Sequence, residues 1–477
     1  MKKTIILFLT FATFVNVAAQ TNYYVDVVNG NDLNNGTSLS STWKTIQKAC
    51  NTATPNSIVQ IKAGTYNENI VVNVSGTIGN PITIKNYLND VVLIDGTIAT
   101  GTTMLTISNK NYLNFENLTI QNRTVNNAQG ILVETTGANT STGLSFSNIT
   151  ISNINWINNA ATIPTATDNA QAFIALGRNG GISNITIDNC HVFNNILGFS
   201  EAISLDGNIN GFTIQNCLVH DNTNIGIVAI GNYTTSTPIN TDHARNGTIK
   251  NNVCYKNVSL YATSGGIYID GGNNIVVSQN KCYENGNGIE VGCEQNGTTD
   301  NITVRDNLVF NNNQSGISVG GYTATTTGQV TNSTIRNNTL FENNSSNDGT
   351  GEIVISKASN CSFENNIIYS SSQSVLMSVD NILPQSGNSL NYNCWFTPQN
   401  NPSAIVVNWR GLTYTTFPSY QTGTSQDVNS LFSNPNLNNA ALPSPELHIL
   451  ATSPCVNTGK SSTLVSVGEK TMKEIHE

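Results

Sequence analysis

Carboxylates are the residues of this chain whose types and spacing could do chemistry, because charged residues make up only 10% of its 477 residues. Asp270 and Glu290 lie about one repeat apart in a series of short, recurring segments. If these segments stack as strands, a shift of one strand and two residues places their Cα atoms roughly 8 Å apart. Cleavage of a glycosidic bond uses two carboxyl groups about 5 to 9.5 Å apart, one as acid and one as base or nucleophile. The pair therefore favours glycoside cleavage.

A third carboxylate, Asp206, falls in the same column of aligned segments as Asp270. Two strand spacings separate them, so their Cα atoms should lie about 9.6 Å apart. Glu294 follows Glu290 in a predicted loop and could join them. The structural alternative is a turn, because Asp206 and Asp270 each precede a glycine and Asp-Gly favours turns. The aligned outward column comprises Glu134, Gly177, Asp206, Ile230, Asp270, Gly292, Gly320 and Ser356.

A lyase would use other groups, because it abstracts a proton next to a uronate carboxyl group and must neutralise that carboxylate with a cation. The candidate bases are Tyr268, His243, Arg245 and Lys357. A Ca²⁺ ion could act as the cation, and it takes several oxygen ligands. The side chains that could supply them are Asp206 and Asp270, with Glu290 and Glu294 beside them.

Other charged residues flank the same predicted face and are candidate substrate contacts. They are Arg178, Glu201, Glu294 and Lys357. For Arg178 and Glu201 the simpler interpretation is an ordinary solvated charge. A long insertion, residues 232–247, carries His243 and Arg245. Insertions in a repeat fold often build one wall of the binding face, although a surface loop is the alternative.

The placement of all these residues depends on a recurring segment with asparagine corners. The copies include residues 187–195, 214–222, 249–257, 278–285 and 304–312. A period of roughly 22 to 35 residues with short Ile-, Val- and Thr-rich strands indicates an all-β solenoid of stacked parallel coils. Stacked asparagine side chains can hydrogen-bond along such a stack. His220 aligns with Phe and Tyr of other copies, so we expect a stacked ring rather than a catalytic base.

The chain divides into four parts. Residues 1–19 have the pattern of a secretory signal, with cleavage near Ala19 and Gln20, which predicts an extracellular or periplasmic protein. The mature chain follows as an N-terminal cap with the first coils, residues 20–97, the coils proper, residues 98–380, and an irregular C-terminal cap, residues 381–477. Helical spacing over residues 43–53 predicts a short helix that covers the first coil. We interpret the charge-rich end, residues 466–477, as a frameshifted end that truncates the cap.

The bulk properties exclude some partners. The net charge of −9 and the lack of basic clusters argue against a nucleic-acid partner. No stretch after the leader approaches the length of a membrane span, and we expect a monomer. The nine cysteines are an odd number. Most look like buried core thiols, since Cys254 and Cys282 align with Val, and Cys190 and Cys217 share a nearby column with Asn. Bridges between Cys254 and Cys282 and between Cys190 and Cys217 stay open.

Several stretches together resemble the N-terminal segment of secreted right-handed parallel β-helix proteins, a group that includes pectate-lyase-like polysaccharide lyases and several glycoside hydrolases. They are residues 23–25, 29–32, 35–36, 43–49 and 61–66, and residues 450 and 453–459 resemble the C-terminal signature of the group. The resemblance implies a pectin-lyase-like β-helix that cleaves a polysaccharide, and acidic polysaccharides are among the candidate substrates. We expect a lyase by resemblance, although one scaffold hosts many reactions. A hydrolase that uses Asp270 and Glu290 and a non-catalytic glycan-binding or adhesion solenoid are the alternatives.

Overall fold

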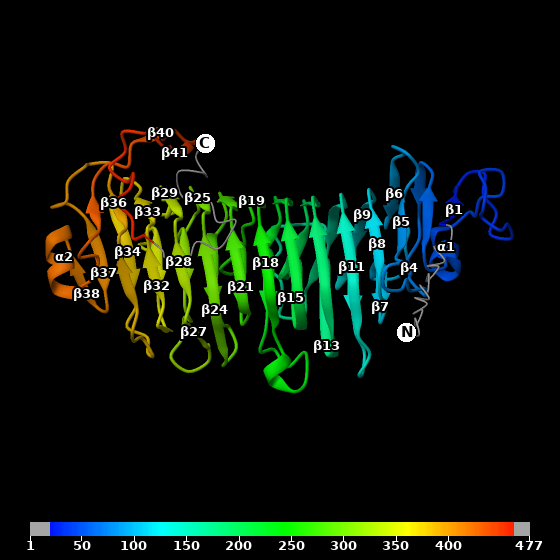
Figure 1. The fold of residues 1–477 in the computed structure, drawn as a ribbon, viewed down its shortest axis with the longest axis horizontal. Coiled ribbons are helices and arrows are strands. Elements are labelled where there is room, and N and C mark those ends of the chain that lie inside the picture. The colour runs from blue at the N-terminus through cyan, green and yellow to red at the C-terminus, as the bar shows by residue number, and fades with distance from the viewer. Residues whose placement is uncertain (1–19, 462–477) are drawn as a thin grey trace, which may run out of the picture.

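The computed structural model describes residues 20–461, which form an elongated stack of parallel strands (Figure 1). A sheet of 26 strands and a sheet of 13 strands run along the stack. Each coil adds strands in parallel register, as where β20 (Gly265–Asp270) pairs with β23 (Asn287–Gly292). The predicted right-handed parallel β-helix is confirmed. The expected signal sequence, residues 1–19, and the unusual end, residues 466–477, lie outside the described residues.

Aliphatic columns fill the interior of the stack. Ile267, Ile289 and Ile317 pair in register on successive coils and are fully buried. Such columns form because alternate residues of each strand point into the stack, as in the buried–intermediate–buried pattern of Ile317–Val319, and β-branched side chains suit these positions. The shorter sheet has a column of the same kind in which Cys254 and Cys282 pair in register. Both thiols are free and buried, as their alignment with valine predicts.

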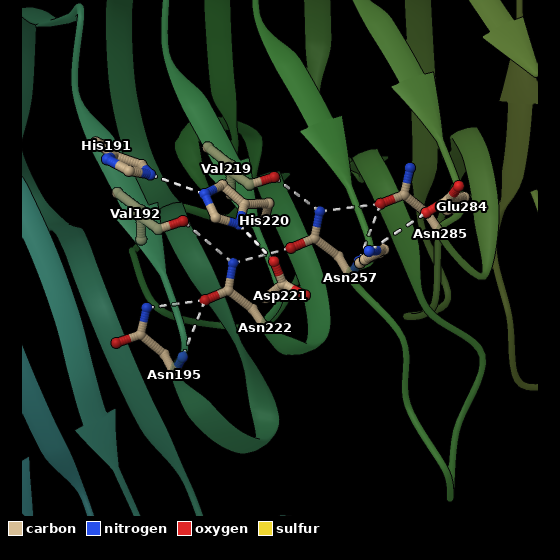
Figure 2. A network of polar contacts seen from close by, with 11 residues as sticks. His191, Val192, Asn195, Val219, His220, Asp221, Asn222, Asn257, Glu284 and Asn285 are labelled. Atoms are coloured by element: carbon tan, nitrogen blue, oxygen red, sulfur yellow. Dashed lines mark hydrogen bonds and ion pairs between the residues drawn. The ribbon is translucent and has the colours of Figure 1, made fainter. Parts of the chain in front are cut away.

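Two ladders of buried asparagines tie the coils together. In the first, the Asn280 Oδ1 atom accepts hydrogen bonds from the backbone and side chain of Asn252, at 2.9 and 3.0 Å. The Asn280 Nδ2 atom donates to the carbonyl of Ile249 and to Asn307 Oδ1, both at 3.0 Å. Figure 2 shows part of the second ladder. Its members are Asn195, Asn222, Asn257, Asn285, Asn312 and Asn343. The ladders pair the side-chain amides of these buried corner asparagines, which accounts for much of the asparagine-rich composition.

The aromatic column predicted for His220 is present on the shorter sheet. The His220 ring stacks on Tyr255 with ring centroids 4.5 Å apart. Its Nε2 atom lies 2.8 Å from Nε2 of His191, and its Nδ1 atom lies 2.6 Å from a carboxylate oxygen of Asp221 (Figure 2). His220 ends β16 (Leu218–His220) of the 13-stranded sheet, whereas the candidate carboxylates lie on the 26-stranded sheet.

The ends of the stack are capped. Helix α1 (Ile46–Thr52) buries Ile46, Ala49 and Cys50 near one end, and its N-cap residue Thr45 accepts a hydrogen bond from the backbone of Lys48, so the expected helix is present. Helix α2 (Phe417–Thr424) lies at the opposite end (Figure 1). No described helix is both long and apolar enough to cross a membrane.

The regular stacking runs further than the boundary expected at residue 380. Strand β35 (Ser389–Asn391) pairs in parallel with β32 (Ser362–Glu364), and β36 (Cys394–Phe396) pairs in parallel with β33 (Ile367–Tyr369). The first asparagine ladder also continues into this coil, because Asn393 accepts hydrogen bonds from the backbone and side chain of Asn366 at 3.0 and 3.1 Å.

The strands of the longer sheet that carry the candidate residues are consecutive in space. They are β13 (Ala170–Asp188), β15 (Ile196–Gln215), β17 (Thr223–Ile230), β20, β23 and β26 (Ile317–Val319). Between β17 and β18 (Ala244–Lys250) the chain leaves the coil and forms a loop with one 3-10 turn, η1 (Ile239–Thr241). This insertion projects from one edge of the stack near β18 (Figure 1). It places new side chains beside the strand ends.

Candidate active site

Two outward columns of the longer sheet form the floor of the candidate site. The first contains Ser204, Val228, Tyr268, Glu290 and Ser318, and the second contains Leu176, Asp206, Ile230, Asp270 and Gly292. The predicted alignment is confirmed with one correction. Gly177 was expected in the second column, but it pairs with Gly207, and Leu176 takes the place beside Asp206. The register shifts between Gly177 and Ile182, and such an irregularity does not show in the apolar pattern.

Asp270 is buried and makes two close contacts. One carboxylate oxygen accepts a hydrogen bond from the backbone of Glu294 at 2.7 Å, and the other accepts one from the Tyr233 hydroxyl at 2.7 Å. The same hydroxyl lies 3.1 Å from Oε2 of Glu294. A phenol has one proton to donate, so satisfying both contacts needs a second proton on one of the two carboxyl groups. Burial, and then the charge of Glu294, raises the pKa of Asp270 to about 7.

Tyr233 is the residue that the sequence analysis missed. It lies in the insertion after β17, and it brings the side chains of Asp270 and Glu294 to within about 6 Å of each other through one hydroxyl. Burial raises the pKa of the Glu294 carboxyl group as well. The only signal in the sequence was an aromatic residue at the start of an insertion already identified as a candidate wall.

Glu290 and Glu201 are two further carboxylates whose pKa values are raised by burial. A Cβ atom on Gly265 would lie 2.8 Å from Oε1 of Glu290, so this carboxyl group lies over a position that glycine leaves open. Burial raises the pKa of Glu290 to about 8. Burial, and then the charges of Asp206, Glu294 and Asp270, raises the pKa of Glu201 to about 8. Glu201 is half-buried and feels the charges of the other carboxylates, and its role as a substrate contact stays a prediction.

Asp206 lies on the other side of Ile230 in a more polar setting. One of its oxygens accepts a hydrogen bond from the Thr235 hydroxyl, again from the insertion, at 3.0 Å. Burial raises the pKa of Asp206 to about 6, while this hydrogen bond and the nearby charge of Arg178 limit the rise. The Arg178 guanidinium forms an ion pair with Glu134 at 2.6 Å. Of Asp206 and Asp270, Asp206 is therefore the carboxylate that ionises at lower pH.

An apolar patch lies between the carboxylates. Ile225, Val228, Ile230 and Tyr268 pack together on the outside of the coil, apart from the interior core, and Tyr233 covers their edge. The Tyr268 hydroxyl lies 3.0 Å from where a Cβ atom of Gly292 would be, so the ring extends along the floor. The four side chains are buried, so the patch is a packed layer beneath the carboxylates that Tyr233 helps to cover.

The basic residues predicted to act here support loops instead. The buried Lys357 ammonium donates to the carbonyls of Thr323, Ala324 and Thr327. Arg245 donates to two carbonyls of the insertion at 3.1 Å and to Asn208 Oδ1 at 2.8 Å. A lysine or arginine bound to several carbonyls has few donors left for substrate. The contacts of Lys357 and Arg245 depend on how the loops between the coils fold, and the repeat pattern of the sequence does not describe those loops.

His243 lies at the base of the same insertion and is not joined to the carboxylate cluster by any described hydrogen bond. Burial, and then the charge of Arg245, lowers its pKa, and its buried Nδ1 atom has no hydrogen-bond partner among the described residues. Tyr268 is the only one of the predicted bases whose ring forms part of the floor. Burial raises its pKa well above the usual range, so its phenol stays protonated.

The carboxylates do not form a ready calcium site. No group of three or more His, Cys, Asp or Glu side chains is placed to hold a metal ion in residues 20–461. Both oxygens of Asp270 already accept hydrogen bonds, from Glu294 and Tyr233, and Ca²⁺ needs six to eight oxygen ligands. The predicted role of Asp206 and Asp270 as Ca²⁺ ligands stays a prediction for chelation experiments.

Comparisons with known proteins place the chain among β-helix proteins. A family model described as "Protein of unknown function (DUF1565)" matches residues 28–73. The uncharacterized protein YwoF of Bacillus subtilis (strain 168) is 32% identical over 448 residues, which cover 91% of this chain and 92% of YwoF. The crystal structure of pectate lyase Pel9A aligns with a TM-score of 0.50 at 16% identity over 94% of each chain. A GH136 lacto-N-biosidase from Eubacterium ramulus aligns with a TM-score of 0.47 at 14% identity, over 79% of this chain and 64% of that one. At such low identity, the match to Pel9A shows a shared fold.

Proposed function

The chain belongs to the family of Bacillus subtilis YwoF, and from that premise and the site geometry we propose that it is a glycoside hydrolase that uses Asp206 and Asp270. One observation carries the proposal: these two carboxylates lie in one outward column with only Ile230 between them. Two strand spacings separate their Cα atoms by about 9.6 Å. Inverting glycosidases hold their carboxyl groups, rather than the Cα atoms, about 6.5 to 9.5 Å apart, with room for a water molecule, so the two side chains must lean toward each other to reach that range.

Asp270 is the general acid in this proposal. A general acid must be protonated at the working pH and must regain its proton after each cycle. The raised pKa of Asp270, about 7, meets the first condition. Glu294, which shares the Tyr233 hydroxyl with it, supports the second as a neighbouring proton carrier. Asp270 would donate its proton to the glycosidic oxygen as the bond to the anomeric carbon breaks.

Asp206 is the general base. Its pKa of about 6 is the lower of the two, so there is a pH range in which it is ionised while Asp270 is protonated. It would take a proton from water as that water attacks the anomeric carbon from the opposite side. A pair of carboxyl groups whose pKa values are pushed apart by their surroundings is the usual basis for assigning acid and base.

The sugar ring would lie on the apolar patch. Ile225, Val228 and Tyr268 are buried and form the layer beneath it, while the half-buried Glu290 and Glu201 at its border offer carboxyl groups with raised pKa values to sugar hydroxyls. The secretory pattern of residues 1–19 supports action on an extracellular or periplasmic glycan.

The test is product analysis with the mature chain on a panel of polysaccharides. A hydrolase releases reducing ends without a new double bond, whereas a lyase gives an unsaturated product that absorbs in the ultraviolet. We expect Asp206→Asn and Asp270→Asn each to lower kcat by about 10²- to 10⁴-fold. Asp188→Asn is the matched control, because its side chain bonds to Asn216, outside the cluster. Glycan binding with no turnover, unchanged in both variants, would instead indicate a binding or adhesion solenoid.

A further inference from the structure

We propose that Cys394 and Cys455 form a disulfide bond that fastens the C-terminal extension to the last coils. Cys394 begins β36, and Cys455 lies in the segment that follows β41 (Glu446–Ile449). Both are thiols in the structure. The proposal does not depend on the proposed hydrolase, because Cys394 lies on the shorter sheet and the candidate site lies on the longer one.

One anchor of the extension lies beside the segment that Cys394 contacts. The Cys394 thiol donates to the carbonyl of Ser433 at 3.4 Å. A few residues further on, the side chain of Asn436 donates to the carbonyl of Thr452 at 3.3 Å. The chain that leads into Cys455 is therefore tied next to the surroundings of Cys394.

A second anchor follows Cys455. The backbone N–H of Lys460 donates to Asn365 Oδ1 at 2.8 Å, and the side-chain amide of Asn365 donates to the carbonyl of Lys460 at 3.1 Å. The next residue, Asn366, accepts a hydrogen bond at its carbonyl from the backbone of Cys394 at 2.8 Å. Between the two anchors the thiols of Cys394 and Cys455 form a hydrogen bond with each other, so the two sulfur atoms are already neighbours.

Two other pairs of thiols are in contact in the described chain, but they are less suited to bond. They are Cys190 with Cys217 and Cys254 with Cys282. Cys254 and Cys282 pair in register on parallel strands, and the specific geometry of a disulfide needs backbone freedom that a ladder restricts. All four of these thiols are buried, whereas Cys455 is half-buried and lies outside the strands. A reagent can therefore reach Cys455, and its loop can adjust.

The bond forms by exchange with an external disulfide, either of a protein or of a small thiol such as glutathione. The Cys455 thiolate attacks one sulfur of the oxidant and releases its first thiol. Contact with Cys394 lowers the pKa of Cys455, which favours this thiolate. Cys394 then loses its proton and attacks the sulfur of Cys455, which releases the second thiol. Two protons and two electrons pass from the cysteines to the oxidant, as the expected extracellular or periplasmic location allows.

The bond would secure a hairpin that covers the aromatic column of the shorter sheet. Strands β40 (Leu437–Asn439) and β41 pair only with each other in the described chain, and an isolated hairpin is at best marginally stable. The hairpin lies along the upper edge of the stack (Figure 1), where Leu447 is buried against Phe310 and Phe341. A cross-link shortly after β41 limits how far the hairpin can move away from these rings.

The first measurement maps the bond in the wild-type chain. The purified protein is incubated with oxidised and reduced glutathione, unfolded in N-ethylmaleimide, digested and analysed by mass spectrometry without reduction. We expect one linked pair of peptides, which joins Cys394 to Cys455, and alkylation of the other cysteines. Alkylation of both Cys394 and Cys455, or a bond from either of them to a different cysteine, would overturn the proposal.

The second measurement tests what the bond holds. In hydrogen exchange, the amides of β40 and β41 should exchange about tenfold faster after the wild-type chain is reduced. Cys455→Ser should exchange fast with or without reductant. Cys50→Ala is the matched control, because Cys50 is a buried thiol of α1 at the other end of the stack, and it should behave as wild type. Exchange in the wild-type hairpin that is the same before and after reduction would also overturn the proposal.

Discussion

Asp206 and Asp270 project from one outward column of the longer sheet, and Ile230 is the single residue between them. Sixty-odd residues of chain separate them, yet the coil repeat returns both to the same face. Their surroundings differ, because Asp206 contacts the Thr235 hydroxyl whereas Asp270 shares the Tyr233 hydroxyl with Glu294. This difference in surroundings accompanies the different pKa values of the two carboxylates, about 6 for Asp206 and about 7 for Asp270.

The first prediction concerns the pH dependence of kcat/KM. The pKa of Asp206 is about 6 and the pKa of Asp270 about 7, and activity requires the first to be ionised and the second protonated. We therefore expect a bell-shaped profile with its maximum between these two values. Steady-state rates from pH 4.5 to 9 check this. Asp188→Asn should keep the same profile, and a flat rate across this range would contradict the assignment.

The second prediction is that Asp270→Asn lowers activity and raises the melting temperature at pH 8. Activity should fall by about 10²- to 10⁴-fold because the proton donor is lost. The pKa of Asp270 is raised in the folded chain, so the folded state binds more protons than the unfolded state, and wild-type stability falls as pH rises from about 4 through about 7. Asparagine has no charge to bury, so the variant should melt roughly 1 to 3 °C higher than wild type at pH 8.

The control for the predicted gain in stability is the same comparison at low pH. At pH 4 the wild-type Asp270 is protonated in the folded chain, so the melting temperatures of wild type and Asp270→Asn should converge. Differential scanning calorimetry at pH 4 and pH 8 makes the comparison. A variant that is less stable than wild type at pH 8 would show that the Asp270 contacts are mainly structural.

The third prediction treats Tyr233 as a positioning residue. Its hydroxyl donates to Asp270 and lowers the pKa of that carboxyl group against the effect of burial. Tyr233→Phe should therefore move the basic limb of the pH profile upward and reduce kcat about tenfold while the ring still covers the floor. Tyr261→Phe, which removes a hydroxyl that bonds to the carbonyl of Gly198, is the matched control and should leave the limb in place.

The column positions could be predicted from the sequence because the corner asparagines set the register. That register placed Asp206, Asp270 and Glu290 on one face, and it placed His220 in the aromatic column. The Tyr233 hydroxyl and the loop-bound ammonium of Lys357 could not be predicted, because both depend on the path of loops between coils. A repeat pattern describes the strands, whereas the chemistry here also depends on the segments that interrupt it.

The fourth prediction concerns the buried asparagine ladder. Asn280→Ala removes an acceptor used twice by Asn252 and a donor to two oxygens. Because the partners stay buried without replacements, we expect a loss on the order of 3 kcal/mol in the free energy of unfolding. Asn274→Gly is the control, because Asn274 belongs to an exposed ladder and has a φ of 51° that glycine accepts. Urea unfolding should show a loss under about 1 kcal/mol for it.

The fifth prediction concerns the two histidines of the shorter sheet. The Nε2 atoms of His191 and His220 lie 2.8 Å apart, so one ring must donate and the other accept, and both cannot be fully protonated without losing the bond. Burial, and then the charge of His220, lowers the pKa of His191. The stability from this contact is therefore present above about pH 6.5, the unfolded value, and is lost as the pH falls through the lower pKa of the folded chain.

The measurement is a comparison of wild type with His191→Phe, which keeps a ring beside Phe193 and cannot be protonated. The buried carboxylates add the opposite slope to both proteins, since their raised pKa values favour the folded state at low pH, so only the difference between the two proteins reports on the histidines. Urea midpoints at pH 7.5 and pH 5 should converge or cross in favour of the variant on acidification. If the gap between the two midpoints is the same at both values, the contact between His191 and His220 does not respond to pH.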